Sequence, residues 1–124
     1  MQKNNGKHIL IVDDSTDNQE LLKIILLSNG YTVHCASNGH EALQMLLELS
    51  TLPDLILLDA QMPVMDGYEF RVQQNMTDRI KNIPVIVMTG DSDASMGKHM
   101  NDPCKVLVKP LRLNSVIETI SLYL

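Results

Sequence analysis

The chain has 124 residues, 44% of them hydrophobic, and a formal net charge of −5 at pH 7. This length and apolar content suffice for one core, so we expect a single domain over residues 1–124. The acidic balance and the aromatic content of 3% argue against nucleic-acid binding. The apolar runs are too short to span a bilayer, and residues 1–7 lack the hydrophobic segment of a secretory signal. We therefore expect a cytoplasmic domain without membrane contact.

Strand and helix signals alternate along the chain, which predicts βα units and a parallel sheet. A first helix follows the opening apolar run of residues 9–12. Thr16 and Gln19 resemble a capping box at its start, and Gly30 is suited to a left-handed cap at its end. The predicted apolar face of this helix consists of Leu21, Leu22, Ile25 and Leu26.

The next two elements are a strand and a helix. Residues 31–36 mix polar and apolar side chains in alternation, which is typical of a strand with one wet face, so we place this strand at the rim of the sheet. Asn38 and Glu41 then predict the start of the second helix. Its expected core face consists of Ala42, Leu43, Leu46 and Leu47.

The second half of the chain is expected to supply three more helices. A loop over residues 62–67 leads into a helix that we expect to end at about Asp78. Residues 90–103 have few apolar anchors and predict a short, poorly packed helix. The last helix is expected to begin near Asn114 and to bury Val116, Ile117, Ile120, Tyr123 and Leu124.

Four apolar runs each end in a polar residue of a kind that handles phosphate or a divalent cation. Unbroken runs of this length suit strands that are buried on both faces of a parallel sheet. Ligands bind outside the carboxyl ends of such strands, and these ends meet only if the first, third, fourth and fifth strands are neighbours. The sequence thus predicts a flavodoxin-like, doubly wound α/β fold with five parallel strands in the order 2-1-3-4-5 and five helices. The runs and their polar ends are residues 9–12 with Asp13 and Asp14, residues 55–58 with Asp59, residues 85–88 with Thr89, and residues 106–108 with Lys109.

The expected cluster of Asp13, Asp14 and Asp59 favours a divalent cation, because neighbouring carboxylates repel one another. Magnesium suits such an all-oxygen site. With Lys109 on the other side and the Thr89 hydroxyl nearby, the site could clamp a phosphoryl group. One carboxylate must then be the nucleophile. Asp59 stands alone on the central strand, whereas Asp13 and Asp14 form a pair suited to the metal, so we expect Asp59 to fill this role.

Each of these features also has an ordinary structural explanation. Asp13 and Asp14 could stabilise a helix N-terminus through their charge. Thr89 could be a turn residue and Lys109 a solvated strand end, while Asp66 is expected to cap the third helix. The convergence of four strand ends on one edge of the sheet is what favours a functional site.

Four short motifs stand at these strand ends: Val12-Asp13-Asp14, Asp59 with Met62-Pro63-Val64-Met65-Asp66-Gly67, Met88-Thr89-Gly90, and Val108-Lys109-Pro110. In these motifs and their order the chain resembles the receiver domain of bacterial two-component response regulators, nearly from end to end. The resemblance implies that Asp59 accepts a phosphoryl group from the phosphohistidine of a histidine kinase or a histidine-phosphotransfer protein. It implies no enzymatic turnover beyond magnesium-dependent autophosphorylation and autodephosphorylation.

The same resemblance implies a set of metal ligands. Mg²⁺, or Mn²⁺ in its place, would be held by Asp14, Asp59 and the backbone carbonyl of Gln61. Asp13 would act mainly through water. The sequence also leaves open a homodimer through the face formed by the fourth helix, the fifth strand and the last helix.

The resemblance further assigns Thr89 and Lys109 to contacts with the phosphoryl group, and Lys109-Pro110 is similar to a cis peptide bond of the family. One position departs from the family pattern. Three residues before Lys109 the family usually has Tyr or Phe, which swings inward with the threonine on phosphorylation. Here that position is Val106, which is too small to act as such a lever.

Two other functions use parts of the same pattern. A receiver-like scaffold that binds partners without phosphorylation would tolerate Val106 and a weak fourth helix. A phosphohydrolase of the haloacid dehalogenase kind also forms an aspartyl phosphate, but it needs Asp-x-Asp at the first strand end. In this chain Asp13 and Asp14 are adjacent, which speaks against the hydrolase. The intact acidic site, with Thr89 and Lys109, favours the phosphoacceptor over the scaffold.

Overall fold

The computed structural model describes residues 6–62, 64–90, 105–109 and 111–124. The helix predicted within residues 90–103 falls almost entirely outside these ranges and stays a prediction. The elements are β1 (His8–Val12), α1 (Thr16–Ser28), β2 (Thr32–Ala36), α2 (Gly39–Glu48), β3 (Leu55–Asp59), α3 (Gly67–Asn75), β4 (Val85–Thr89), β5 (Lys105–Val108) and α5 (Leu113–Tyr123).

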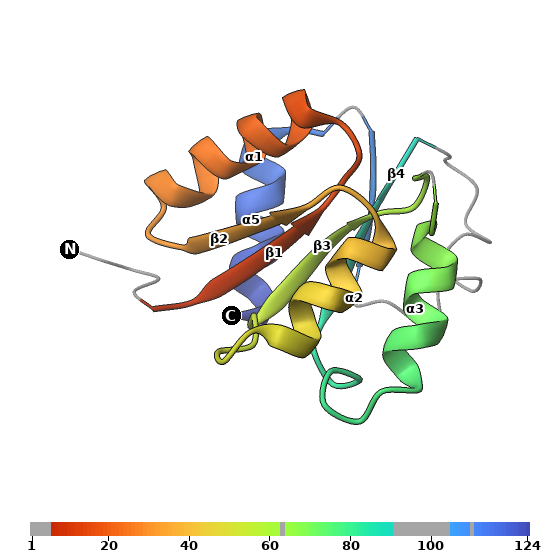
Figure 1. Ribbon diagram of the computed structural model, residues 1–124. Coiled ribbons are helices and arrows are strands. Elements are labelled where there is room, and N and C mark those ends of the chain that lie inside the picture. The colour runs from red at the N-terminus through yellow and green to blue at the C-terminus, as the bar shows by residue number, and fades with distance from the viewer. Residues whose placement is uncertain (1–5, 63, 91–104, 110) are drawn as a thin grey trace.

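The five strands form one parallel sheet in the order β2-β1-β3-β4-β5, which confirms the predicted topology (Figure 1). All residues of β3 and β4 are buried, which explains why these strands are apolar almost throughout. The strands at the two rims, β2 and β5, are partly exposed. The rim position predicted for the second strand from its alternating sequence is therefore confirmed.

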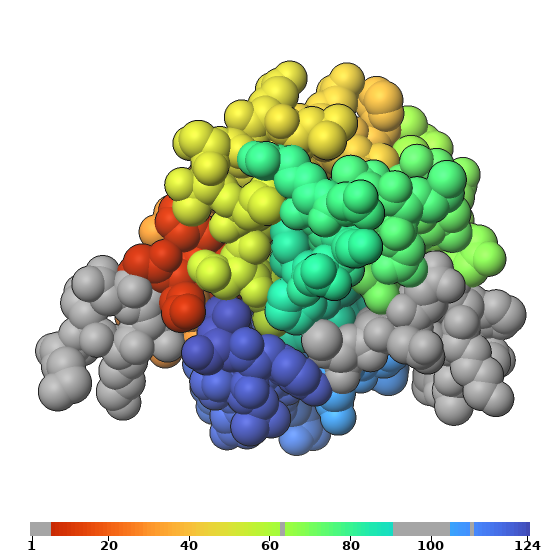
Figure 2. All heavy atoms as spheres, turned by 90° about the horizontal axis from the view of Figure 1, so that it is seen from below, coloured from red at the N-terminus to blue at the C-terminus, as the bar shows by residue number. Residues whose placement is uncertain are grey.

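The sheet separates two apolar cores. Ile9 and Ile11 of β1 pack with α1 and α5, whereas Leu10 and Val12 pack with α2 and α3. This alternation follows from the two-residue period of a strand. Figure 2 shows the resulting layers, with α5 (blue) on one side of the molecule and α2 and α3 on the other. Within the described ranges, no helix combines the length and the apolar character needed to cross a bilayer.

The start of α1 differs from the prediction. Its N-cap is Ser15, whose Oγ accepts the N–H of Asn18 at 3.2 Å, and not Thr16. Gln19 does not complete a capping box, because its side-chain amide donates instead to the Asp13 carbonyl at 2.6 Å. The end of the helix is as predicted, since Gly30 has the positive φ of 88° that closes it.

The apolar faces of α1 and α2 are narrower than predicted. Leu22 and Leu26 are buried, but Leu21 is 50% exposed because it lies about 100° around the helix from Leu22. In α2 the cap formed by Asn38 is confirmed, since its side chain accepts the N–H of Glu41 at 2.8 Å. Ala42 and Leu46 are buried and Leu43 is partly buried, but the prediction for Leu47 was wrong, because it lies on the flank of that stripe and is 60% exposed.

The helix α3 begins as predicted and ends early. Asp66 caps it in a capping box with Glu69. The helix stops at Asn75 and not near Asp78. The side-chain amide of the buried residue Gln74 donates to the carbonyls of Ile80 and Ile83, both at 3.0 Å, and so holds the chain in a turn beyond the helix.

The helix α5 buries Val116 and Ile120, as expected, while Ile117 and Leu124 are partly buried. Tyr123 was wrongly assigned to the core, since it is 39% exposed. It stands three residues beyond Ile120, on the edge of the buried stripe, where the polar end of its ring can remain in water.

Gly39, the first residue of α2, lies against the loop that follows β3. Its N–H donates to the Met65 carbonyl at 3.1 Å. A Cβ at position 39 would stand 2.8 Å from Met65 Cγ and 3.0 Å from the Met65 carbonyl oxygen. The close approach of these two segments therefore requires glycine.

We expect the substitution Gly39→Ala to destabilise the protein by about 1–2 kcal/mol, because overpacking must displace Met65 or the helix. Helix propensity alone would predict the opposite sign. Urea unfolding measures the change, and Gly90→Ala is the matched control, since a Cβ there meets nothing within 4 Å. Equal stabilities of the two variants would contradict the expected clash.

Candidate functional site

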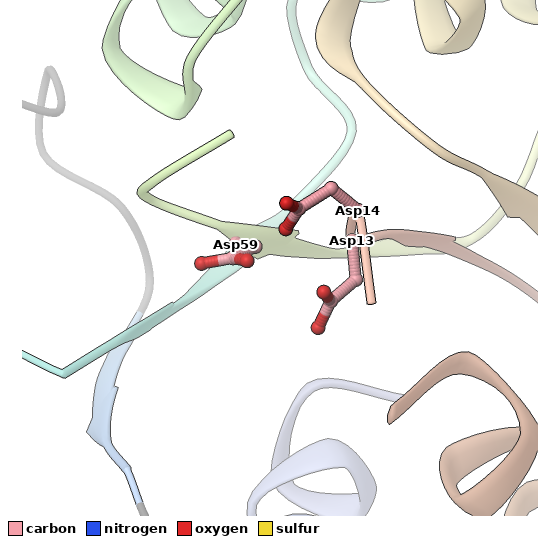
Figure 3. A group of neighbouring side chains, drawn as sticks. All are labelled: Asp13, Asp14 and Asp59. Atoms are coloured by element: carbon pink, nitrogen blue, oxygen red, sulfur yellow. The ribbon is translucent and has the colours of Figure 1, made fainter. Parts of the chain in front are cut away.

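Three aspartates meet above the ends of two neighbouring strands. Val12 of β1 pairs with Leu58 of β3, so the residues that follow them, Asp13 and Asp59, stand side by side. One carboxylate oxygen each of Asp13, Asp14 and Asp59 lie within 4.8 Å of one another. Figure 3 shows the three side chains gathered at this edge. The structure therefore brings together the three acids that the strand-end pattern singled out.

The three acids differ in burial and in their contacts. Asp13 is fully buried, and its carboxylate accepts the N–H of Ser15 at 2.8 Å and the side-chain amide of Asn18 at 3.4 Å. Asp59 is also buried, whereas Asp14 is exposed. Within the described part of the chain, the Asp14 carboxylate takes part in no hydrogen bond or ion pair. Asp13 is thus fixed by the protein, and Asp14 is open to an external partner.

Lys109 supplies the positive charge of the site. Its Nζ lies 3.3 Å from Asp59 Oδ2, while Asp59 Oδ1 accepts the N–H of Gln61 at 3.2 Å. The residue follows β5 directly, and its backbone N–H donates to the carbonyl of Thr89 at 2.7 Å. Thr89 is the last residue of β4 and is fully buried. The ends of β4 and β5 therefore lie beside the acidic cluster, as predicted.

The Asp59 carboxyl is held in an unfavourable environment for a charge. Burial raises its pKa from 3.8 to about 6, and the neighbouring charge of Asp13 acts in the same direction. The Gln61 N–H and the Lys109 ammonium oppose this rise only in part. The ionised site therefore carries an electrostatic cost that a bound cation would relieve.

The donor set fits a hard divalent cation. It consists of carboxylate oxygens only, one of them on an exposed side chain, and such ligands suit magnesium. The described contact of Gln61 is made by its N–H, so metal ligation by the Gln61 carbonyl stays a prediction. The bond between Lys109 and Pro110, predicted to be cis, involves a residue outside the described ranges.

Sequence reasoning missed three polar residues that hold the acid pair in place: Ser15, Asn18 and Gln19. Two of them bind the Asp13 carboxylate, and the third binds the Asp13 carbonyl. The available signal was a serine directly after the acid pair, which suits an N-cap better than Thr16 does once the helix start is placed. The spacing of residues along one helix does not show which acceptor a long side chain such as Gln19 reaches.

Comparisons with known proteins agree with this geometry. The family model of the response regulator receiver domain matches residues 9–121. The polar-differentiation response regulator DivK of Brucella anthropi is 33% identical, over 95% of this chain and 96% of its own length. The solved structure of response regulator TrrA from Thermotoga maritima, in complex with Mg(2+)-BeF, is 30% identical with a TM-score of 0.83, and the match covers 95% of this chain and 99% of that one.

A longer relative is matched only in part. The sensor histidine kinase CheAY of Helicobacter pylori is 38% identical over 81 residues, which are 65% of this chain and 10% of that protein. The chain thus spans a tenth of this kinase and nearly the whole of DivK.

The substitution Asp59→Asn is expected to stabilise the metal-free protein near neutral pH. Because the folded-state pKa of about 6 lies above the ordinary 3.8, the folded state binds the proton more tightly than the unfolded state does. The carboxyl therefore costs stability as pH rises from about 4 to 6, and the cost is complete above that window. Two pKa units correspond to about 3 kcal/mol as an upper limit, and we expect a gain of about 1–2 kcal/mol.

This gain is measured by urea unfolding with a chelator at about pH 7.5 and again near pH 3, below the pKa of the carboxyl in both states, where the two proteins should be equally stable. Added magnesium should stabilise the wild type more than the variant. An Asp59→Asn protein that is less stable than the wild type at the higher pH would show that the carboxylate contributes favourable interactions to the fold.

Proposed function

The chain belongs to the response regulator receiver domains, which act in two-component phosphorelay signalling, and from this premise we propose that Asp59 is its phosphoacceptor. The observation that carries the proposal is the surroundings of this carboxylate. The Asp59 carboxylate has Lys109 Nζ at 3.3 Å on one side and the oxygens of Asp13 and Asp14 within 4.8 Å. A nucleophile between a cation and an acidic metal-type site suits phosphoryl transfer.

The chemistry is an in-line displacement at phosphorus. An ionised oxygen of Asp59 attacks the phosphoryl group of a phosphohistidine, the P–O bond forms and the P–N bond breaks. The imidazole leaves with the bonding electron pair and a proton restores its neutral form. With a pKa of about 6, Asp59 is mostly ionised at neutral pH and competent to attack. Lys109 then transfers its contact from the carboxylate to a phosphoryl oxygen, and the Thr89 hydroxyl donates to another.

We assign the cation to Asp14, Asp59 and the backbone carbonyl of Gln61, with Asp13 acting through water. When bound there, magnesium supplies charge neutralisation for the phosphoryl oxygens. The all-carboxylate donor set and the Mg(2+)-BeF complex of the related protein TrrA support magnesium. The same oxygen donors would accept manganese.

We also propose the setting in which this reaction takes place. The phosphodonor is a histidine kinase or a histidine-phosphotransfer protein, and residues 1–124 act as one receiver domain in the cytoplasm. The match over residues 9–121 supports this extent. The domain has no turnover of its own beyond magnesium-dependent autophosphorylation and autodephosphorylation. A homodimer through β5, α5 and the fourth helix, which was predicted from residues outside the described ranges, is compatible with the exposure of Val108 and Leu122, which are 48% and 81% exposed.

A phosphorylation-independent scaffold is the second candidate. It is favoured by Val106, which occupies the place of the usual aromatic lever and packs, partly buried, against the core between the sheet and α2 and α3. A scaffold has no need for the buried, mutually repelling carboxylates of Asp13 and Asp59, so the phosphoacceptor remains the better account.

The acceptor is tested by incubating the protein with acetyl phosphate and Mg²⁺ and measuring its intact mass. We expect the wild type to gain one phosphoryl group, and we expect no gain with a chelator or in Asp59→Asn. Asp54→Asn is the matched control, since Asp54 is a carboxylate at the opposite end of the sheet that accepts the His8 N–H at 2.8 Å. This control should be phosphorylated like the wild type.

A gain by Asp59→Asn equal to that of the wild type would move the acceptor to another residue. If no protein gains mass, the assay is repeated with a phosphorylated histidine-phosphotransfer protein. Failure with that donor too would favour the scaffold.

A further inference from the structure

Gln19 contacts the acid pair from the first helix turn of α1. Its Nε2 donates to the Asp13 carbonyl at 2.6 Å and lies 3.3 Å from the Ala36 carbonyl and 3.4 Å from Ser37 Oγ. One side-chain amide thus joins the segment that carries Asp13 and Asp14 to the end of β2. Nothing in the reaction described above uses this residue.

The contact of Gln19 with the Asp13 carbonyl replaces a backbone hydrogen bond that a longer β2 would have made. The last backbone bond between β1 and β2 runs from the Asp13 N–H to the Ala36 carbonyl at 3.0 Å. In a parallel ladder the next donor, to the Asp13 carbonyl, would come from the backbone that continues β2. The chain instead turns at Ser37 toward α2, and the Gln19 amide takes the place of that donor. Without this donor the buried Asp13 carbonyl would have no hydrogen-bond partner among the described residues, which would destabilise its present position.

The position of this carbonyl bears directly on Asp14. The Asp13 carbonyl belongs to the peptide unit that links Asp13 to Asp14, and its orientation sets the direction in which the Asp14 side chain leaves the backbone. The Asp13 carboxylate has its own anchors in Ser15 and Asn18. The Asp14 carboxylate has none within the described residues, so its placement depends on this peptide unit.

We propose that Gln19 is a positioning residue for the cation site, which holds Asp14 in place through the Asp13 carbonyl. This inference rests on the proposed function, because it takes the acidic cluster to be a magnesium site. Partners that orient metal ligands without touching the ion typically change metal affinity 10–100-fold when they are removed. Gln19 should therefore control how tightly the site binds Mg²⁺ and leave the nucleophile Asp59 unaffected.

The test is the substitution Gln19→Met, which keeps the length of the side chain and removes the donor. The dissociation constant for Mg²⁺ is measured by following backbone amide resonances in a titration of the folded protein, so that a change in stability alone does not enter. We expect the constant to rise about tenfold. The rate of phosphorylation by acetyl phosphate should approach that of the wild type once Mg²⁺ is saturating.

The matched control is Gln73→Met, the same substitution at an exposed position of α3, which should bind Mg²⁺ like the wild type. If Gln19→Met does not fold, Gln19→Asn takes its place, since it keeps the amide but shortens its reach by one methylene. A dissociation constant within threefold of the wild type overturns the proposal, whether or not stability falls. If the wild type does not bind Mg²⁺ at all, the proposed cation site itself is overturned. The wild-type titration therefore distinguishes a wrong cation site from a wrong role for Gln19.

Discussion

The repulsion between two buried carboxylates, Asp13 and Asp59, is the constraint around which this end of the molecule is built. They are placed together because β1 and β3 are neighbours in the sheet and both strands end at the same edge. The fold compensates each charge differently. Asp13 accepts hydrogen bonds from the first turn of α1, while Asp59 has the Gln61 N–H and the Lys109 ammonium. The contacts of Asp59 do not cancel the cost of its charge, since burial and the neighbouring Asp13 still raise its pKa to about 6. The ionised site therefore favours the binding of positive charge, which suits the proposed reaction with a cation and a phosphoryl group.

The loops that carry these acids are tied to the same short turn between β2 and α2. Gln19 joins the Asp13 carbonyl to Ala36 and Ser37, and Gly39 donates to the Met65 carbonyl in the loop after β3. The segment from Ala36 to Gly39 is therefore hydrogen-bonded both to Gln19 of α1 and to the loop that follows β3. These hydrogen bonds connect the segments around the acidic cluster to the turn between β2 and α2.

The exposed apolar residues of α1 and α2 show that the borders of a buried helix face are difficult to predict from sequence. Leu21 and Leu47 each lie beside a buried leucine, at the border of the stripe that faces the sheet. Whether such a border residue is covered depends on the neighbouring helix and loop, which a single periodic pattern does not contain. Tyr123 is a similar case at the end of α5. The centres of the stripes, in contrast, were predicted correctly for all three helices.

The sequence by itself determined the order of elements, the parallel sheet and the identity of the acids at its edge, because buried strands leave long apolar runs that end abruptly in polar residues. It also determined the caps at Asn38 and Asp66, since a cap and its partner lie three residues apart. Only the tertiary structure decided which residues hold the acids in place. Gln19 reaches the carbonyl of Asp13, directly after β1, and the Ala36 carbonyl at the end of β2. Contacts of one side chain with two separate segments cannot be read from the spacing of residues along one helix. The raised pKa of Asp59 likewise results from burial and neighbouring charge, which exist only once the strands are assembled.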